Sequence, residues 1–114
     1  MKIFSKTDTG RVRKANQDAY FAGRIADSAV FAVVCDGMGG ANAGNVASQN
    51  AVRHISEYLI KSYRDSMRAD EIEKMVRNAV ISANIRLYDM SVGNAALSGM
   101  GTTVVLAFIR DGCA

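Results

Sequence analysis

Two acidic residues, Asp18 and Asp36, occupy positions in the sequence where carboxylates can hold a metal ion. Asp36 follows a run of apolar residues and precedes Gly37, whose missing side chain leaves its own carbonyl accessible as a ligand. Asp18 begins the preceding strand-like segment. Carboxylates at strand ends, beside glycine-rich backbone, suit hard cations such as Mg²⁺ and Mn²⁺. Asp36, Gly37 and Asp18 are therefore the candidate metal-ligating residues.

Arg13 adds a group that could bind phosphate, because it precedes Asp18 by five residues and its planar guanidinium matches a pair of phosphate oxygens. Carboxylates for a metal together with an arginine for phosphate indicate phosphoryl chemistry. Each residue also has a simpler interpretation. Asp36 and Gly37 fit an ordinary turn, Asp18 fits a turn-capping residue, and Arg13 fits a solvated surface charge. The residue types alone leave both interpretations open.

Nucleotide binding is the competing explanation for the glycine-rich segment Asp36–Gly44, since it follows a strand-like run and precedes a helical pattern. A P-loop would require Gly-Lys-Ser or Gly-Lys-Thr, which is absent. A dinucleotide fingerprint started at Gly37 would require Gly or Ala where the chain has Asn42. Asp36 would also place a negative charge beside a pyrophosphate. The sequence therefore argues against both nucleotide motifs.

The hydrophobic pattern predicts an α+β chain that would position these residues. Strands are predicted over residues 1–5, 18–25, 29–35 and 102–109, a loop over 36–44, and helices over 45–63 and from Asp70 to Gly93. Asp70 and Glu73 have the spacing of a capping box at the second helix. The short link at 26–28 predicts an antiparallel hairpin, which would bring Asp18 and Asp36 to the same end of a sheet.

The composition is that of one ordinary globular domain: 114 residues, 49% hydrophobic, with a formal net charge of +3. The longest apolar runs are too short to span a membrane, and the first residues turn polar too early for a signal peptide, so a cytoplasmic protein without a membrane partner is expected. The small charge, with no aromatics among the basic residues near Arg13, argues against nucleic acid. Cys35 and Cys113 lie too far apart in sequence to indicate a zinc motif.

Three ordered motifs give the chain a resemblance to a known family. They are TDTGRVRKANQD at 7–18, VCDGMGG at 34–40 and GMGTT at 99–103. Together they resemble the bacterial branch of the metal-dependent type 2C (PPM) Ser/Thr protein phosphatases. The resemblance implies part of an antiparallel β-sandwich flanked by helix pairs, in α-β-β-α layers, with two Mn²⁺ or Mg²⁺ ions at one end. Because family domains are about twice this length, residues 1–114 are expected to be the N-terminal part of a single catalytic domain.

The resemblance also implies a role for each candidate site residue. Asp36 corresponds to the carboxylate that bridges both metals, the Gly37 carbonyl to a ligand of one metal, and Asp18 to the acidic residue of the second. Arg13 corresponds to the arginine that holds the substrate phosphate, so Arg13 and Asp36 are the expected catalytic residues. The implied reaction is hydrolysis of phosphoserine or phosphothreonine in proteins by a metal-bridging water. Met38 stands where some family members have a histidine proposed as general acid, which leaves that role unassigned.

The length has consequences for activity and assembly. In the family that the chain resembles, further aspartates lie in the distal half of the domain, so the isolated chain is expected to be inactive although the resemblance is to an enzyme family. The alternative is a non-catalytic half-domain that binds a phosphoprotein or another partner. The expected partners are phosphorylated proteins, substrates of a Ser/Thr kinase, and a homo-oligomer could form through an exposed sheet face.

Overall fold

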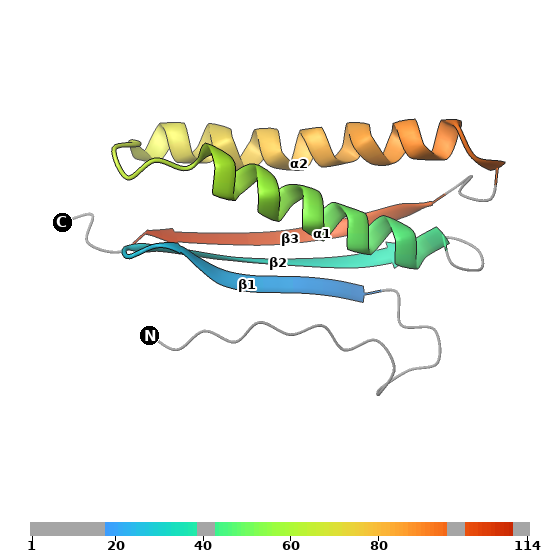
Figure 1. The fold of residues 1–114 in the computed structure, drawn as a ribbon, viewed down its shortest axis with the longest axis horizontal. Coiled ribbons are helices and arrows are strands. Elements are labelled where there is room, and N and C mark those ends of the chain that lie inside the picture. The colour runs from blue at the N-terminus through green and yellow to red at the C-terminus, as the bar shows by residue number, and fades with distance from the viewer. Residues whose placement is uncertain (1–17, 39–42, 96–99, 111–114) are drawn as a thin grey trace.

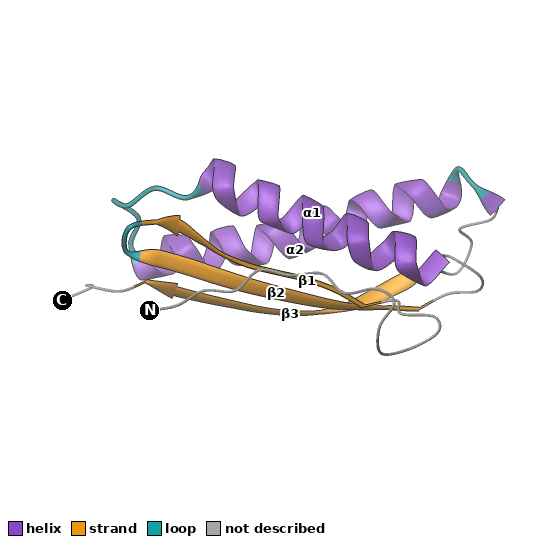
Figure 2. Ribbon diagram, turned by 60° about the horizontal axis from the view of Figure 1, so that its bottom comes forward, coloured by secondary structure: helices purple, strands orange, loops and turns teal. Residues whose placement is uncertain are grey.

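A computed structural model describes residues 18–38, 43–95 and 100–110 of the chain. They form a three-stranded antiparallel sheet in the order β1-β2-β3 and two long helices (Figure 1). The elements are β1 (Asp18–Ala26), β2 (Ala29–Met38), α1 (Ala43–Ser62), α2 (Ala69–Val92) and β3 (Gly101–Arg110). Both helices lie on the same side of the sheet (Figure 2). The predicted α+β class is confirmed, and the described residues contain one sheet.

The β1–β2 hairpin forms as predicted, with a turn at residues 27–28. Alternate residues of β2 face the helices and are buried, namely Phe31, Val33 and Cys35, which are 0–3% exposed. The intervening residues Val34 and Met38 are about half exposed, at 46% and 52%. This period of two shows that the helices cover one face of the sheet. The described residues leave the opposite face uncovered, and we call it the open face.

The predicted loop over 36–44 is wrong at both ends. β2 continues through Asp36 and Gly37 to Met38, because β3 pairs with it along all three residues, which lie opposite Thr103, Thr102 and Gly101. α1 begins at Ala43 and not at residue 45. The glycines at 37 and 44 thus lie within regular elements, and only residues 39–42 separate β2 from α1. Asp36 therefore lies in the central strand of the sheet, with β1 on one side and β3 on the other.

The helices bury the apolar stripes that the sequence predicts. α1 packs against the sheet through residues 0–1% exposed: Ala47, Ala51, Ile55 and Leu59. α2 lies mainly against α1 and buries Met75, Ala79, Ala83 and Leu87. These residues recur every three or four positions, as expected for one face of a helix. The two helices and the sheet face that they cover therefore form one hydrophobic core.

The start of α2 differs from the prediction. Arg68 has the extended backbone of an N-cap residue, and its amide donates to Glu71 Oε1 at 2.8 Å. The Asp70 carboxylate instead accepts from Arg68 Nε at 3.3 Å, and this hydrogen bond lowers the pKa of Asp70. The predicted pairing of Asp70 with Glu73 is wrong because the helix begins at Ala69, which moves every cap position toward the N-terminus.

Several sequence predictions fall outside the described residues. They include the strand at 1–5, Arg13 and Cys113. Within the described part of the chain, neither helix is long and apolar enough to cross a membrane.

Candidate metal and phosphate site

Asp18 and Asp36 stand directly opposite each other in the antiparallel pairing of β1 with β2. Asp18 is the first residue of β1, and Asp36 lies two residues before the end of β2. Residues that oppose each other in such a ladder lie on the same face of the sheet, with Cβ atoms about 5 Å apart. The predicted proximity of these two positions is therefore confirmed. It follows from a tight hairpin whose register the alternating apolar residues fix.

The Asp36 carboxylate lies on the open face, between Val34 and Met38 along the strand. It is exposed, whereas its neighbour Cys35 is fully buried on the helix side. On β3 the residue opposite Asp36 is Thr103, which is also exposed. One row of the sheet thus carries Asp18, Asp36 and Thr103 side by side. Asp36 lies at the centre of this row and is exposed, so a hydrated cation can approach its carboxylate directly.

The position of Thr103 beside Asp36 was not predicted, because no pattern in the sequence pairs the strand at 102–109 with the hairpin. The third motif contains Thr102 and Thr103, but it does not indicate which strand pairs with them. Thr102 lies opposite Gly37 and is part of the same strand end. The Thr102 hydroxyl donates to the Thr103 carbonyl at 2.9 Å. Gly37 itself is buried, so its backbone is packed at the edge of the candidate site.

Cys35 is adjacent to Asp36 but is unsuited to metal binding. Burial raises the pKa of the Cys35 thiol to about 11, an effect that a hydrogen bond with Thr102 partly opposes. The thiol therefore stays protonated at neutral pH, and metals bind the thiolate. The side chain belongs to the hydrophobic core beneath the helices.

The acidic residues at this end of the sheet are of the kind that divalent cations prefer. Two acidic residues directly opposite in a sheet repel each other unless a positive charge offsets them. Oxygen donors are the ligands that Mg²⁺ and Mn²⁺ prefer, and Mg²⁺ usually retains several waters beside one or two carboxylates. No group of three or more His, Cys, Asp and Glu side chains occurs within the described ranges. Of the predicted ligands, the exposed Asp36 carboxylate is the one that the structure shows open to a cation. Arg13 lies outside the described residues.

Comparison with known families gives one match over most of the chain. The sequence model of the family described as protein phosphatase 2C matches residues 9–114. Among individual proteins, the chain is 36% identical over 106 residues to the serine/threonine phosphatase stp of Listeria monocytogenes, which covers 93% of this chain and 42% of that protein. It is 31% identical over 113 residues to the protein phosphatase PhpP of Streptococcus pneumoniae, covering 97% of this chain and 44% of the relative.

Solved structures give the same result for the fold. The chain superposes on the serine/threonine phosphatase Stp1 of Staphylococcus aureus with a TM-score of 0.75 and 32% identity, over 95% of this chain and 41% of that one. It superposes on the Mycobacterium tuberculosis phosphatase PstP/Ppp with a TM-score of 0.72 and 28% identity, over 97% and 43% of the two chains. The chain thus spans less than half the length of these relatives.

Proposed function

Because the chain belongs to the protein phosphatase 2C family, we propose that it is the N-terminal part of a catalytic domain that removes phosphate from phosphoserine and phosphothreonine in proteins. The observation that carries the proposal is the direct opposition of Asp18 and Asp36 beside Gly37. It is supported by the likeness to bacterial Ser/Thr phosphatases over 93% of the chain. Residues 1–114 form one part of a single domain in this proposal.

Each candidate residue has a defined task in the proposed reaction. Asp36 and the Gly37 carbonyl bind a divalent ion, and Asp18 supports a second. Arg13 binds the substrate phosphate with its guanidinium and fixes the orientation of the phosphoryl group. Mn²⁺ or Mg²⁺, when bound, lowers the pKa of water and offsets charge on phosphoryl oxygens. The exposed position of Asp36 at the strand end leaves room for a protein substrate to approach.

A chimeric enzyme tests the activity. Residues 1–114 would replace the matching segment of the Listeria monocytogenes phosphatase, and phosphate release from a phosphothreonine peptide would be followed with Mn²⁺. We expect turnover that falls about 100-fold or more in Asp36→Asn, since loss of a metal ligand removes the activated water. The matched control is Asp65→Asn, which should retain activity. Asp65 is an exposed residue in the segment that connects α1 to α2. A chimera that is folded by circular dichroism but shows no turnover would contradict the proposal.

Metal binding can be measured on the chain itself. Electron paramagnetic resonance detects free Mn²⁺, so its signal falls as the protein binds the ion. We expect binding by the wild type and by Asp65→Asn, and much weaker binding by Asp36→Asn. Equal binding by all three proteins would remove Asp36 from the proposed metal site. We expect the chain alone to release no phosphate, because the described part supplies fewer than three clustered ligands.

A non-catalytic binding function is the second candidate, and the small ligand set of the described residues favours it. In that case the chain binds a phosphorylated protein without hydrolysing it. Fluorescence anisotropy with a labelled phosphothreonine peptide separates the two functions. Peptide binding that survives Asp36→Asn, combined with an inactive chimera, would support the binding module. Turnover by the chimera would exclude it.

The open face of the sheet supports a further proposal about assembly. Val34, Val105 and Ile109 lie on this face and are 46%, 68% and 54% exposed. Such a patch is expected to be covered, so we propose that two copies of the chain pair through it. Sedimentation velocity should show a dimer for the wild type and a monomer for Val105→Lys. Ile60→Lys, at a 55% exposed position on α1, is the control and should remain dimeric. A monomeric wild type would contradict this assembly.

The natural substrates in this proposal are cytoplasmic proteins phosphorylated by a Ser/Thr kinase. The test is phosphate release by the chimera from kinase-labelled protein, compared between Ser/Thr-phosphorylated and Tyr-phosphorylated substrates. Release from phosphotyrosine alone would contradict the substrate class.

A further inference from the structure

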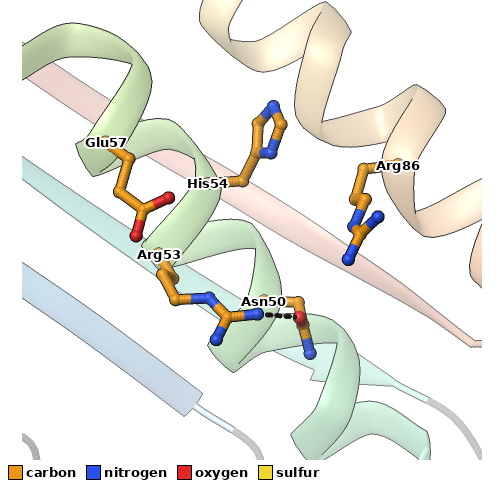
Figure 3. A pocket seen from close by; sticks show the side chains of 5 residues that line it. All are labelled: Asn50, Arg53, His54, Glu57 and Arg86. Atoms are coloured by element: carbon orange, nitrogen blue, oxygen red, sulfur yellow. Dashed lines mark hydrogen bonds between the residues drawn. The ribbon is translucent and has the colours of Figure 1, made fainter. Parts of the chain in front are cut away.

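A polar pocket lies between the two helices, on the side of the sheet opposite to the open face that carries Asp36. It has a volume of about 400 Å³. Five residues line it: Asn50, Arg53, His54 and Glu57 from α1, and Arg86 from α2 (Figure 3). The four α1 residues follow the spacing i, i+3, i+4, i+7, so they share one face of that helix. All five side chains are polar, and Arg53, Glu57 and Arg86 are exposed, so the pocket is open to solvent.

Arg86 lacks the partners that other arginines have. Arg68 pairs with Asp70 and Arg77 with Glu73, both at 3.3 Å. Three further arginines, Arg24, Arg64 and Arg110, donate to backbone carbonyls. Among the arginines that the structure describes, Arg86 has no hydrogen bond or ion pair. Its guanidinium extends from α2 toward α1 and Asn50 (Figure 3), so all its donors remain available to a ligand.

Arg53 is held in place on the opposite wall. Its Nη2 donates to Asn50 Oδ1 at 2.7 Å, and Asn50 Nδ2 in turn donates to the Val46 carbonyl at 2.8 Å. Asn50 is therefore tied to its own helix and to Arg53, and Arg53 still has further N–H groups to donate. His54 Nε2 lies 2.7 Å from Ser82 Oγ and links the two helices at the pocket. The pocket thus has guanidinium groups from both helices, and a hydrogen bond joins the helices beside it.

Among the described residues that line the pocket, Glu57 is the single acidic one. It lies four residues after Arg53, and no ion pair joins the two within 4 Å in the described structure. A basic residue followed by an acidic one at this spacing is the less favourable order along a helix. The lining therefore keeps two guanidinium groups against one carboxylate, and its charged groups sum to a net positive charge.

We propose that this pocket binds a phosphoryl group, at a site separate from the proposed metal site. Guanidinium groups form paired hydrogen bonds with phosphate oxygens. A planar carboxylate would satisfy the donors of one arginine, whereas a tetrahedral phosphoryl group presents oxygens to both helices at once. The volume also exceeds that of a phosphate group alone, so it accommodates the moiety that carries the phosphate. The group can come from free phosphate or from a phosphorylated side chain.

Inorganic phosphate is the first probe, titrated into the isotopically labelled chain to about 20 mM, which nearly saturates a site with a millimolar Kd. EDTA is present throughout, so that no metal site contributes, and NaCl keeps the ionic strength constant. We expect amide shifts in residues 50–57 and 82–86. Arg86→Gln and Arg53→Gln should each weaken binding about tenfold. Glu57→Gln should strengthen it, because it removes the only opposing charge.

Arg77→Gln is the matched control, since Arg77 is an exposed arginine on α2 that already pairs with Glu73. Its phosphate affinity should equal that of the wild type. A second arm compares a phosphoserine peptide with the same peptide unphosphorylated. Tighter binding of the phosphopeptide than of free phosphate identifies a phosphorylated side chain as the ligand, and equal affinity identifies free phosphate. Shifts that chloride alone reproduces, or an affinity unchanged in Arg86→Gln, would overturn the proposal while leaving the proposed phosphatase function untouched.

Discussion

Asp18 and Asp36 are Cα partners across the β1–β2 hairpin, so two acidic residues occupy one row at the end of the sheet. Like charges directly opposite in a sheet destabilise it by up to about 1 kcal/mol. If the proposed cation binds beside these residues, we expect the hairpin to be more stable with the cation than without it. The relationship connects the stability of the sheet to the occupancy of the proposed metal site.

Asp36→Asn should consequently change stability in opposite directions with and without metal. In EDTA we expect the variant to unfold at slightly higher urea than the wild type, by about 0.5 kcal/mol, because the repulsion is relieved. With Mn²⁺ in excess, binding stabilises the wild type but not the variant, and the order reverses. Asp65→Asn should match the wild type under both conditions. The same order of stabilities in EDTA and in Mn²⁺ would contradict this coupling.

The core beneath the helices can be tested at Ile55, which is completely buried on the inner face of α1. Ile55→Ala removes three carbon atoms from a packed interior, and we expect a loss of about 3 kcal/mol in the free energy of unfolding. Ile60 lies on the same helix but is 55% exposed. Ile60→Ala should change stability by less than about 0.5 kcal/mol. Urea denaturation of both variants gives the comparison, and equal losses would show that α1 packs in another orientation.

The sequence predicted those parts of the structure that depend on residues close together along the chain. The hairpin, both helices and the proximity of Asp18 to Asp36 follow from a short turn and from regular apolar spacing. The pairing of Asp36 with Thr103 was missed because it joins segments separated by two helices, and no local pattern records it. β2 is longer than predicted for the same reason: residues 36–38, which were predicted to lie in a loop, pair with β3. The position of Arg86 opposite Arg53 likewise depends on how the helices pack.

The contact between His54 and Ser82 is the third test, because it joins α1 to α2 through a 2.7 Å hydrogen bond. Ser82→Ala should destabilise the chain by about 1 kcal/mol. His54→Asn should have a smaller additional effect in Ser82→Ala than in the wild type, since the shared hydrogen bond is already lost. A double-mutant cycle by urea denaturation measures the coupling. Strictly additive losses would show that the two side chains do not interact in solution.

Cys35 provides the last test, through the pH dependence of stability. Burial raises its pKa from 9.0 to about 11, so the thiol ionises in the unfolded chain before it ionises in the folded one. The unfolded state therefore releases its proton first as the pH rises, which favours unfolding. Stability from this group is intact below pH 9 and declines between pH 9 and about 11.

The measurement compares Cys113→Ser with the double variant Cys113→Ser, Cys35→Ala, so that Cys35 is the only thiol that differs. The difference between their free energies of unfolding should be constant below pH 9. As the pH approaches 11, the single variant, which keeps Cys35, should lose stability relative to the double variant. Because the folded thiol is both protonated and buried, a thiol reagent at about pH 8 should label Cys35 only as fast as the chain opens. Rapid labelling of folded protein, or a difference that does not vary with pH, would show that Cys35 is accessible to solvent.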